Sequence, residues 1–279
     1  MFQPDLLKNH VILITGGGTG LGKSMALRFA ELGASIALCG RREHVLAEAA
    51  KEIEAKGVPT FIYPCDVRKA DEVEKMADAV FAKFGKISGL VNNAAGNFVS
   101  PTEALSPNGF DAIVKIVLYG TFHCTQSIGK RWMAAKSGGR ILNIVTTYAW
   151  TGSAFVVPSA CAKAGVLAMT RSLAVEWAKY KIRLNAIAPG PFKTEQTWNN
   201  LMPEGFEQKM IARNPMGRTG THDELTNLAA YLMSPQAAYI NGECVTIDGG
   251  EWLQGAGEFN GLLELTMNDW LAMKARAGK

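Results

Sequence analysis

The chain has 279 residues, of which 48% are hydrophobic and 19% are charged, so it can bury a globular core and is neither disordered nor collagen-like. Its net charge of +4 is modest and its Lys and Arg residues are dispersed, which makes nucleic acid a poor candidate partner but leaves room for a small anionic ligand. The five Cys residues are scattered and never spaced as C-x-x-C, which indicates reduced core thiols and excludes a zinc cluster or disulfide framework.

Short apolar and β-branched segments alternate with helical patterns along the whole chain. Strands are predicted at residues 11–15, 35–39, 60–63, 89–92, 140–145, 183–187 and 244–247. Helices are predicted at residues 22–32, 43–56, 69–84, 108–136, 159–180 and 221–233. The alternation predicts a doubly wound α/β fold of Rossmann type, with a parallel sheet covered on both faces. Because no repeat or linker interrupts it, we expect residues 1–279 to form a single domain.

In such sheets, ligands bind beyond the carboxyl ends of the strands, so the loops that follow the first six strands should converge on one site. The first of these loops is rich in glycine and reads TGGGTGLG over residues 15–22. Glycines allow the backbone to approach a pyrophosphate closely, and the following helix N-terminus meets its charge. A strand before the loop and a helix after it make this pattern specific for a dinucleotide. The predicted contacts from this loop are Gly16, Gly18, Thr19, Gly20 and Leu21.

The end of the second strand indicates which dinucleotide is bound. An enzyme that uses NAD usually has an acidic residue about 20 residues after the glycine loop, where it binds the ribose hydroxyls. This chain instead has Cys39-Gly40-Arg41-Arg42. A guanidinium fork can hold the additional 2′-phosphate of NADP, so Arg41 favours NADPH as the cofactor.

Further motifs accompany the glycine loop, namely residues 92–96 (NNAAG), Lys163 on a long helix and residues 189–191 (PGP). Together they make the chain resemble the short-chain dehydrogenase/reductase family over nearly its whole length. The resemblance implies a nicotinamide cofactor. It also implies that the cofactor contacts further residues, namely Asp66, Val67, Asn93, Ala94, Lys163, Pro189, Gly190 and Phe192.

The chain departs from the usual ketone reductases of this family at three positions. Those members carry a Tyr one helical turn before the Lys, but here that position is Ser159, a weaker acid with a shorter side chain. Thr146 stands in place of the usual Ser, and Val117 stands in place of an Asn on the preceding long helix. The three differences indicate either an inactive protein or different chemistry.

A different chemistry has its own sequence match. Residues 93–98 (NAAGNF), 147–149 (TYA), 156–163 (VVPSACAK) and 257–260 (GEFN) resemble the mitochondrial-type 2,4-dienoyl-CoA reductases. In that group the phenol comes from the loop after the fifth strand, which is Tyr148 here, and a carboxamide comes from the loop after the fourth, which is Asn97. The resemblance implies that Lys163 holds the nicotinamide ribose and that Ser159 joins the catalytic hydrogen bonds.

These residue types suit the reduction of a conjugated thioester. Hydride added to the distal carbon leaves negative charge on the thioester oxygen, and two fixed donors such as the Tyr148 hydroxyl and the Asn97 amide stabilise it. The expected activity is NADPH-dependent reduction of 2,4-dienoyl-CoA to 3-enoyl-CoA in unsaturated fatty acid β-oxidation, with Tyr148 or water giving the final proton. A carbonyl or sugar-alcohol reductase and a catalytically silent NADP-binding protein remain alternatives.

The resemblance also implies that the acyl-CoA substrate meets Arg68, Phe98, Ser106, Thr146 and Ser159. The apolar segment at about 192–213 has the composition of a lid, and a C-terminal tail follows at about 251–279. By resemblance we expect a homotetramer in which the long helices pair between subunits. The absence of a signal, a long apolar run and a terminal Ser-Lys-Leu favours a cytoplasmic protein without a membrane partner. From the scattered cysteines we expect no metal site.

Overall fold

The computed structural model describes residues 2–194 and 205–276. Part of the expected lid, residues 195–204, therefore lies outside the described residues, as does the end of the tail at 277–279. Within the described ranges, no helix is both long and apolar enough to cross a bilayer.

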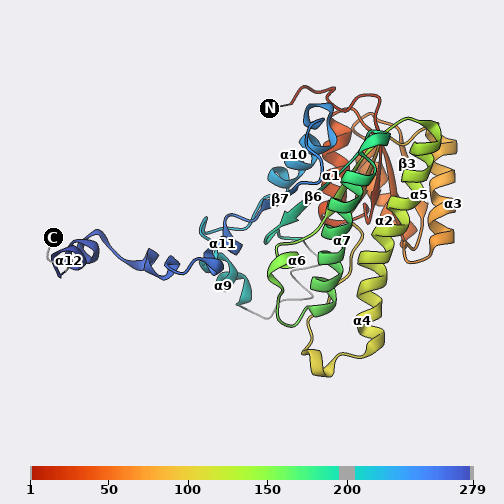
Figure 1. Ribbon diagram of the computed structural model, residues 1–279. Helices are drawn as coiled ribbons and strands as arrows, with labels where there is room; N and C mark the ends of the chain where they lie inside the picture. Colours follow the sequence, from red (N-terminus) through yellow and green to blue (C-terminus); the bar gives the residue numbers. More distant parts are fainter. Residues whose placement is uncertain (1, 195–204, 277–279) are drawn as a thin grey trace.

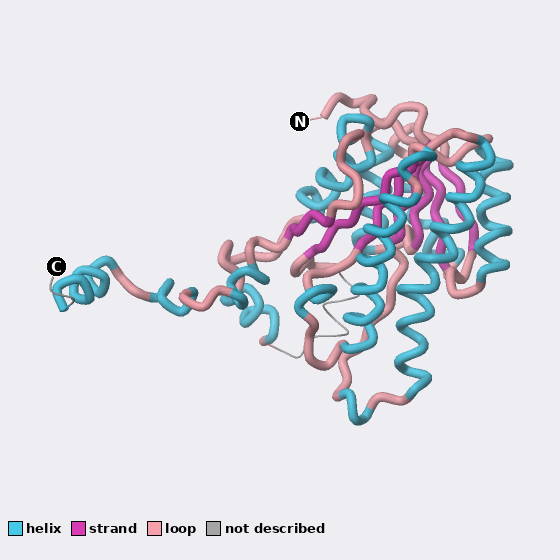
Figure 2. Tube along the Cα trace, in the orientation of Figure 1, coloured by secondary structure: helices cyan, strands magenta, loops and turns pink. Residues whose placement is uncertain are grey.

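A seven-stranded parallel sheet, ordered β3-β2-β1-β4-β5-β6-β7, forms the centre of the molecule (Figures 1 and 2). The strands are β1 Val11–Thr15, β2 Ser35–Gly40, β3 Thr60–Pro64, β4 Gly89–Asn92, β5 Gly139–Ile144, β6 Ile182–Pro189 and β7 Cys244–Ile247. The strand order reverses between β1 and β4, which is where doubly wound folds bind ligands. The predicted Rossmann-type α/β fold is confirmed, and every predicted strand is present.

Among the described residues, six helices cover the two faces of the sheet. The helices are α1 Gly20–Glu31, α2 Glu43–Glu54 and α10 His222–Met233 on one face, and α3 Ala70–Phe84, α5 Gly120–Ala135 and α7 Val157–Glu176 on the other (Figure 1). Successive residues of β1 point to opposite faces of the sheet. Ile12 and Ile14 therefore join the hydrophobic cluster on the face covered by α1, while Leu13 joins the cluster on the face covered by α3. Apolar burial on both faces explains why the strands read as continuous hydrophobic runs.

The long helix predicted at 108–136 is not a uniform α-helix. It consists of α4 Pro107–Val114, a π-helical segment at Lys115–Tyr119, and α5. The helix predicted at 159–180 likewise ends in a short 3₁₀ segment, Ala178–Tyr180. Hydrophobic periodicity alone does not distinguish these helix types, because each is a short segment that continues an α-helix.

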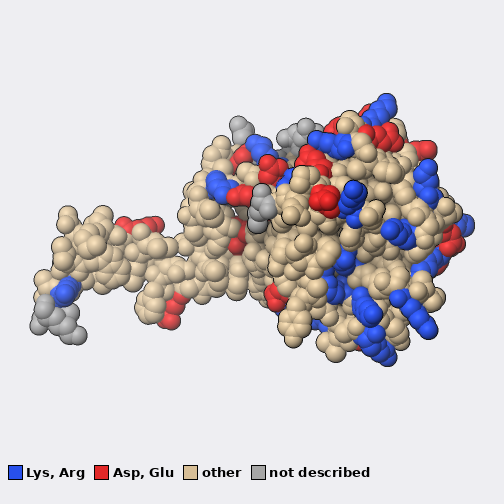
Figure 3. Space-filling view, turned by 90° about the horizontal axis from the view of Figure 1, so that it is seen from above, with Lys and Arg blue, Asp and Glu red and all other residues tan. Residues whose placement is uncertain are grey.

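Several short helices lie outside the predicted pattern. They are Thr102–Ala104, α6 Tyr148–Thr151, α9 Phe206–Arg213, Pro235–Ala237, α11 Glu251–Ala256, Asn260–Glu264 and α12 Met267–Arg276. In Figure 1 the segment that contains α12 projects away from the body, and Figure 3 shows the same projection from a second direction. The loops that follow the strands meet at the opposite edge of the sheet from the N-terminus, near α6.

Candidate active site

A cavity of about 520 Å³ lies at the carboxyl ends of the strands. Loops from each of the first six strands line it, as the sequence predicted for a doubly wound sheet. It contains each residue expected to contact the cofactor, namely Gly16, Gly18, Thr19, Gly20, Leu21, Arg41, Asp66, Val67, Asn93, Ala94, Lys163, Pro189, Gly190 and Phe192. The expected catalytic residues Asn97, Tyr148, Ser159 and Lys163 line it as well.

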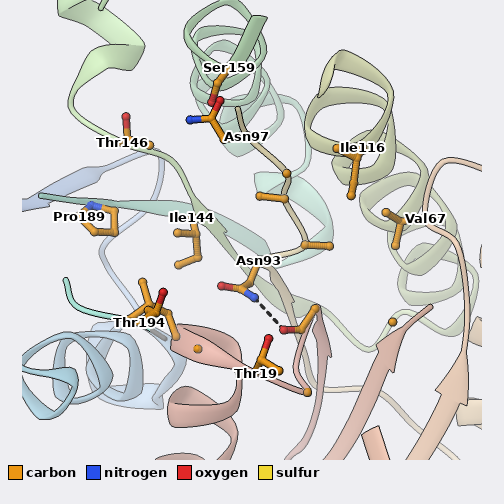
Figure 4. Close-up of a pocket in the computed structure, with 18 of the residues that line it drawn as sticks. Thr19, Val67, Asn93, Asn97, Ile116, Ile144, Thr146, Ser159, Pro189 and Thr194 are labelled. Carbon is orange, nitrogen blue, oxygen red and sulfur yellow. Dashed lines mark hydrogen bonds between the residues drawn. The ribbon is translucent and has the colours of Figure 1, made fainter. Parts of the chain in front are cut away.

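The glycine-rich loop is fixed by the loop that follows β4. The Asn93 side-chain amide donates to the carbonyl oxygens of Thr15 at 3.1 Å and Gly16 at 3.2 Å, a contact visible in Figure 4. A Cβ atom at Gly22 would lie 2.5 Å from the Asn93 amide nitrogen and 2.5 Å from the Gly16 oxygen. Gly16 itself has a φ of +63°, which favours glycine. The close approach leaves backbone amides at the start of α1 facing the cavity, an arrangement that fits a pyrophosphate.

Positive charge lines the cavity where β2 ends. Arg41 and Arg42 both reach its wall, and no acidic residue occupies the ribose position after β2. Among the described residues of this wall, Asp66 is the one carboxylate, and it is bound by the guanidinium of Arg68, with Nε 2.9 Å from each carboxylate oxygen. That hydrogen bond and charge hold the pKa of Asp66 below its usual value. This wall therefore presents guanidinium groups suited to an anionic phosphate group.

Tyr148 and Ser159 form a hydrogen-bonded pair in the middle of the cavity. The Tyr148 hydroxyl lies 3.0 Å from the Ser159 hydroxyl, and either atom can donate. Tyr148 is the first residue of α6, and Ser159 lies in the first turn of α7 with only 2% of its surface exposed. Thr146 directs the start of α6, because its hydroxyl accepts a hydrogen bond from the Tyr148 backbone N–H at 3.2 Å. The phenol of α6 and the hydroxyl in the first turn of α7 thus share a hydrogen bond inside one cavity.

Lys163 lies one turn further along α7 and is 7% exposed. Burial lowers the pKa of its ammonium from 10.5 to about 8. Its Nζ donates a hydrogen bond to the carbonyl oxygen of Ile144, the last residue of β5. The ammonium is consequently held between the end of the sheet and the cavity, where it can bind a ribose hydroxyl.

Asn97 lies next to Ser159, with Thr146 to their left in Figure 4. The Asn97 Oδ1 atom accepts the backbone N–H of Phe98 at 3.0 Å. This bond fixes the carboxamide and leaves its NH₂ group available to a ligand. Asn97 and Tyr148 therefore offer two donors to one cavity.

The expected substrate contacts divide into two groups. Thr146 and Ser159 line the cavity, whereas Arg68, Phe98 and Ser106 are not among the described residues of its wall. Ser106 is the N-cap of α4 and accepts the Gly109 N–H at 3.1 Å. Phe98 packs on the apolar cluster around Ile113, and Arg68 is paired with Asp66 as described above. Each of these three has a structural partner, and their contact with substrate stays a prediction.

The cavity also contains residues that the sequence did not reveal. Val45, Cys65, Ile116, Ile144 and Thr194 line it. Ile144 ends β5 and Cys65 directly follows β3, and these positions are a signal that could have identified them. Ile116 lies in the π-helical segment, and no local pattern marks an apolar helix residue as part of a site. Over residues 2–194 and 205–276, no group of three or more His, Cys, Asp or Glu could hold a metal ion.

Comparisons with known proteins agree with this geometry. The profile of a family described as "Enoyl-(Acyl carrier protein) reductase" matches residues 16–251. A protein from Bacillus subtilis named "Probable 2,4-dienoyl-CoA reductase [(2E)-enoyl-CoA-producing]" is 46% identical over 252 residues, which cover 88% of this chain and 98% of that protein. A Caenorhabditis elegans protein named "Probable 2,4-dienoyl-CoA reductase 3 [(3E)-enoyl-CoA-producing]" is 44% identical, with 90% and 83% covered.

Solved structures show the same similarity in three dimensions. The crystal structure of a short chain dehydrogenase from Bacillus anthracis has a TM-score of 0.82 and 48% identity, covering 88% of this chain and 98% of that one. A gluconate 5-dehydrogenase from Burkholderia cenocepacia, solved in complex with NADP and tartrate, has a TM-score of 0.84 and 31% identity, covering 90% and 98%. The length of these matches and the residues gathered in the cavity lead to one conclusion: the chain belongs to the short-chain dehydrogenase/reductase family.

Proposed function

We propose that this protein reduces 2,4-dienoyl-CoA thioesters to 3-enoyl-CoA with NADPH, in the β-oxidation of unsaturated fatty acids. The observation that carries the proposal is the Tyr148 hydroxyl, placed by α6 at 3.0 Å from Ser159 in a cavity that Lys163 and Asn97 also line. The relatives named 2,4-dienoyl-CoA reductase support the substrate class, and Arg41 supports the choice of NADPH.

When bound, the nicotinamide supplies a hydride to the distal carbon of the diene. The Tyr148 hydroxyl and the Asn97 NH₂ group then hold the thioester oxygen, on which negative charge develops. One such donor is typically worth about 2.7 to 4 kcal/mol of barrier. Ser159 orients the phenol through their shared hydrogen bond, and Lys163 holds the ribose and keeps positive potential close to the phenol.

The site of protonation decides the product. A proton delivered to the α-carbon gives a 3-enoyl thioester, whereas a proton delivered to the γ-carbon gives a 2-enoyl thioester. The α-carbon is bonded to the carbonyl carbon, so a phenol that holds the carbonyl oxygen lies closest to it. This proximity favours the 3-enoyl product, with Tyr148 or a water beside it as the donor. The names of the two relatives above include both outcomes, which product analysis distinguishes.

The experiment is to incubate the purified protein with NADPH and 2,4-hexadienoyl-CoA. We expect loss of dienoyl absorbance together with oxidation of the cofactor, and a 3-enoyl thioester when the product is analysed by NMR. Turnover of ketones or sugars alone would contradict the proposal and favour a carbonyl or sugar-alcohol reductase. Cofactor binding with no turnover of either substrate class would instead indicate a silent binding protein.

Two variants connect this activity to the site. Tyr148→Phe keeps the ring but loses the hydroxyl, so turnover should fall by two or more orders of magnitude. Asn97→Asp keeps an acceptor for the Phe98 N–H but loses the NH₂ donor, so turnover should fall about 10²- to 10³-fold. Both variants should bind cofactor as the unmodified protein does, because neither change touches the glycine-rich loop. A variant that retains full turnover would remove its residue from the mechanism.

A further inference from the structure

A second cavity, of about 880 Å³, lies at the amino ends of the strands, opposite the active site. We call it the amino-edge cavity, and define it by His10, Lys86, Arg140, Lys181, Arg183 and Tyr239 in its wall. None of the described residues that line it is Asp or Glu. Figure 3 looks onto this edge of the molecule. A hollow lined by cations without carboxylates holds a positive potential that attracts anions.

Arg140 is the central group of the amino-edge cavity. It lies on β5 directly beside Arg183 of β6 in the strand register, so two guanidinium groups occur at neighbouring positions. Arg140 is half-buried, and within the described part of the chain its guanidinium has no hydrogen bond and no ion pair. Burial lowers its pKa, and no carboxylate opposes that effect. The guanidinium is open to the cavity and bound by no other side chain of the described residues, so it is available to an anion that enters.

The other cations of the cavity differ from Arg140. Arg183 donates to the carbonyl oxygens of Ile240 at 2.8 Å and Leu232 at 3.0 Å, so the fold itself explains this residue. Lys86 and Lys181 are exposed and follow helix C-termini, where the helix dipole favours a positive charge. Neither explanation applies to Arg140, which is a strand residue.

His10 reports the same electrostatic environment. Burial, followed by the charge of Arg140 and then that of Lys86, lowers the pKa of its imidazole. Its Nδ1 atom lies 3.1 Å from the carbonyl oxygen of Lys8. The positive field of the cavity thus extends from β5 to the segment before β1.

We propose that the amino-edge cavity is a binding site for a small phosphate-bearing anion, with Arg140 as its principal ligand. A guanidinium fork matches the geometry of two phosphate oxygens, and the charges of Arg183, Lys86 and Lys181 add to its attraction. The ring of Tyr239 is fully exposed at the wall of the same cavity, which gives a nucleoside phosphate a surface for its base. This site is separate from the cofactor cavity, because the two share no lining residue.

The test is calorimetric titration of the full chain, saturated with NADPH, with inorganic phosphate, pyrophosphate and ADP. We expect pyrophosphate to bind more tightly than phosphate, because it meets more of the cations. Arg140→Gln should weaken the binding of pyrophosphate at least tenfold, and Arg140→Lys should weaken it less. Lys51→Gln removes one positive charge from the exposed side of α2, and this control should bind pyrophosphate as the unmodified protein does.

A further variant distinguishes the two cavities. If the anion bound at the cofactor cavity instead, Arg41→Ala would abolish binding and Arg140→Gln would not, and this result would overturn the proposal. Absence of pyrophosphate binding would overturn it as well. Thermal denaturation distinguishes a loss of binding from a loss of folding. Without phosphate, Arg140→Gln should melt no lower than the unmodified protein, because it removes an unpaired charge. With pyrophosphate present, only the proteins that retain Arg140 should melt at a higher temperature, and an equal rise for Arg140→Gln would contradict the assignment.

Discussion

Lys163 lines the candidate active site, but burial of its charge lowers the stability of the fold. Lowering its pKa from 10.5 to about 8 corresponds to a free energy on the order of 3 kcal/mol that disfavours the charged form in the folded state. At pH 7 the ammonium is charged in both the folded and the unfolded chain, so the whole of this cost opposes folding. Between about pH 8 and 10.5 the unfolded chain binds more protons, and stability contributed by this group rises with pH.

Replacing Lys163 with Met should therefore stabilise the protein without cofactor while abolishing turnover. The carbonyl of Ile144 loses its donor in this variant, which offsets part of the gain. We expect the melting temperature at pH 7 to rise by a few degrees, and the difference to disappear near pH 10.5. Thermal denaturation at both pH values checks this, and an equal difference at the two values would show that burial of the charge is not its cause.

Arg41 is the residue at which the choice of cofactor can be measured. Loss of charge-assisted hydrogen bonds to a 2′-phosphate corresponds to about a 10- to 100-fold change. Arg41→Ala should raise the Michaelis constant for NADPH by that factor and change that for NADH little. Steady-state kinetics with both cofactors checks the prediction, and equal effects would leave the preference without support from this residue.

At the level of elements, α6 links the catalytic loop to the C-terminal region. The rings of Trp150 in α6 and Trp252 in α11 meet edge to face, with their centroids 5.6 Å apart. Glu251 of α11 is paired in turn with Arg213 of α9. The short helix that carries Tyr148 therefore packs on a residue about 100 positions away in the chain, and local sequence gives no sign of that contact.

Because Trp252 contacts the helix that carries Tyr148, we expect it to position the Tyr148 hydroxyl. Trp252→Ala should lower kcat several-fold while the dissociation constant of the cofactor stays unchanged, because Trp252 is not among the described residues that line the cavity. Trp252→Phe retains an aromatic ring and should restore most of the turnover. Kinetics together with cofactor titration distinguishes this role from general destabilisation, in which case cofactor binding would weaken too.

For the molecule as a whole, the sequence predicted the features that depend on local sequence patterns. Alternating patterns located all seven strands, and the glycine-rich loop located the cofactor end of the cavity. The π-helical segment and α6 were not predicted, because their geometry depends on packing between distant segments. Substrate contacts such as Ser106 rested on resemblance alone, and the structure shows this residue as a helix cap. The amino-edge cavity escaped prediction because Arg140 and Arg183 meet only when β5 and β6 pair.

The assembly expected from the family can be tested on exposed apolar residues of the long helices. Val175 of α7 is 81% exposed, and Tyr119 and Phe122 at the start of α5 are 50% and 43% exposed. Such residues are suited to pairing between subunits. Light scattering should give a mass about four times the 30.0 kDa of the chain. Val175→Glu should reduce that mass by placing like charges in a symmetric interface, and a monomeric unmodified protein would contradict the expected tetramer.

The hydrogen bonds of Asn93 have a consequence for engineering. This residue anchors the glycine-rich loop, and the same stretch of backbone continues within four residues to Asn97. The segments that we propose to bind the dinucleotide and the thioester are thus joined through Asn93. Replacing either segment alone with that of another reductase would disrupt the Asn93 hydrogen bonds. A chimaera with altered selectivity therefore has to exchange both loops together.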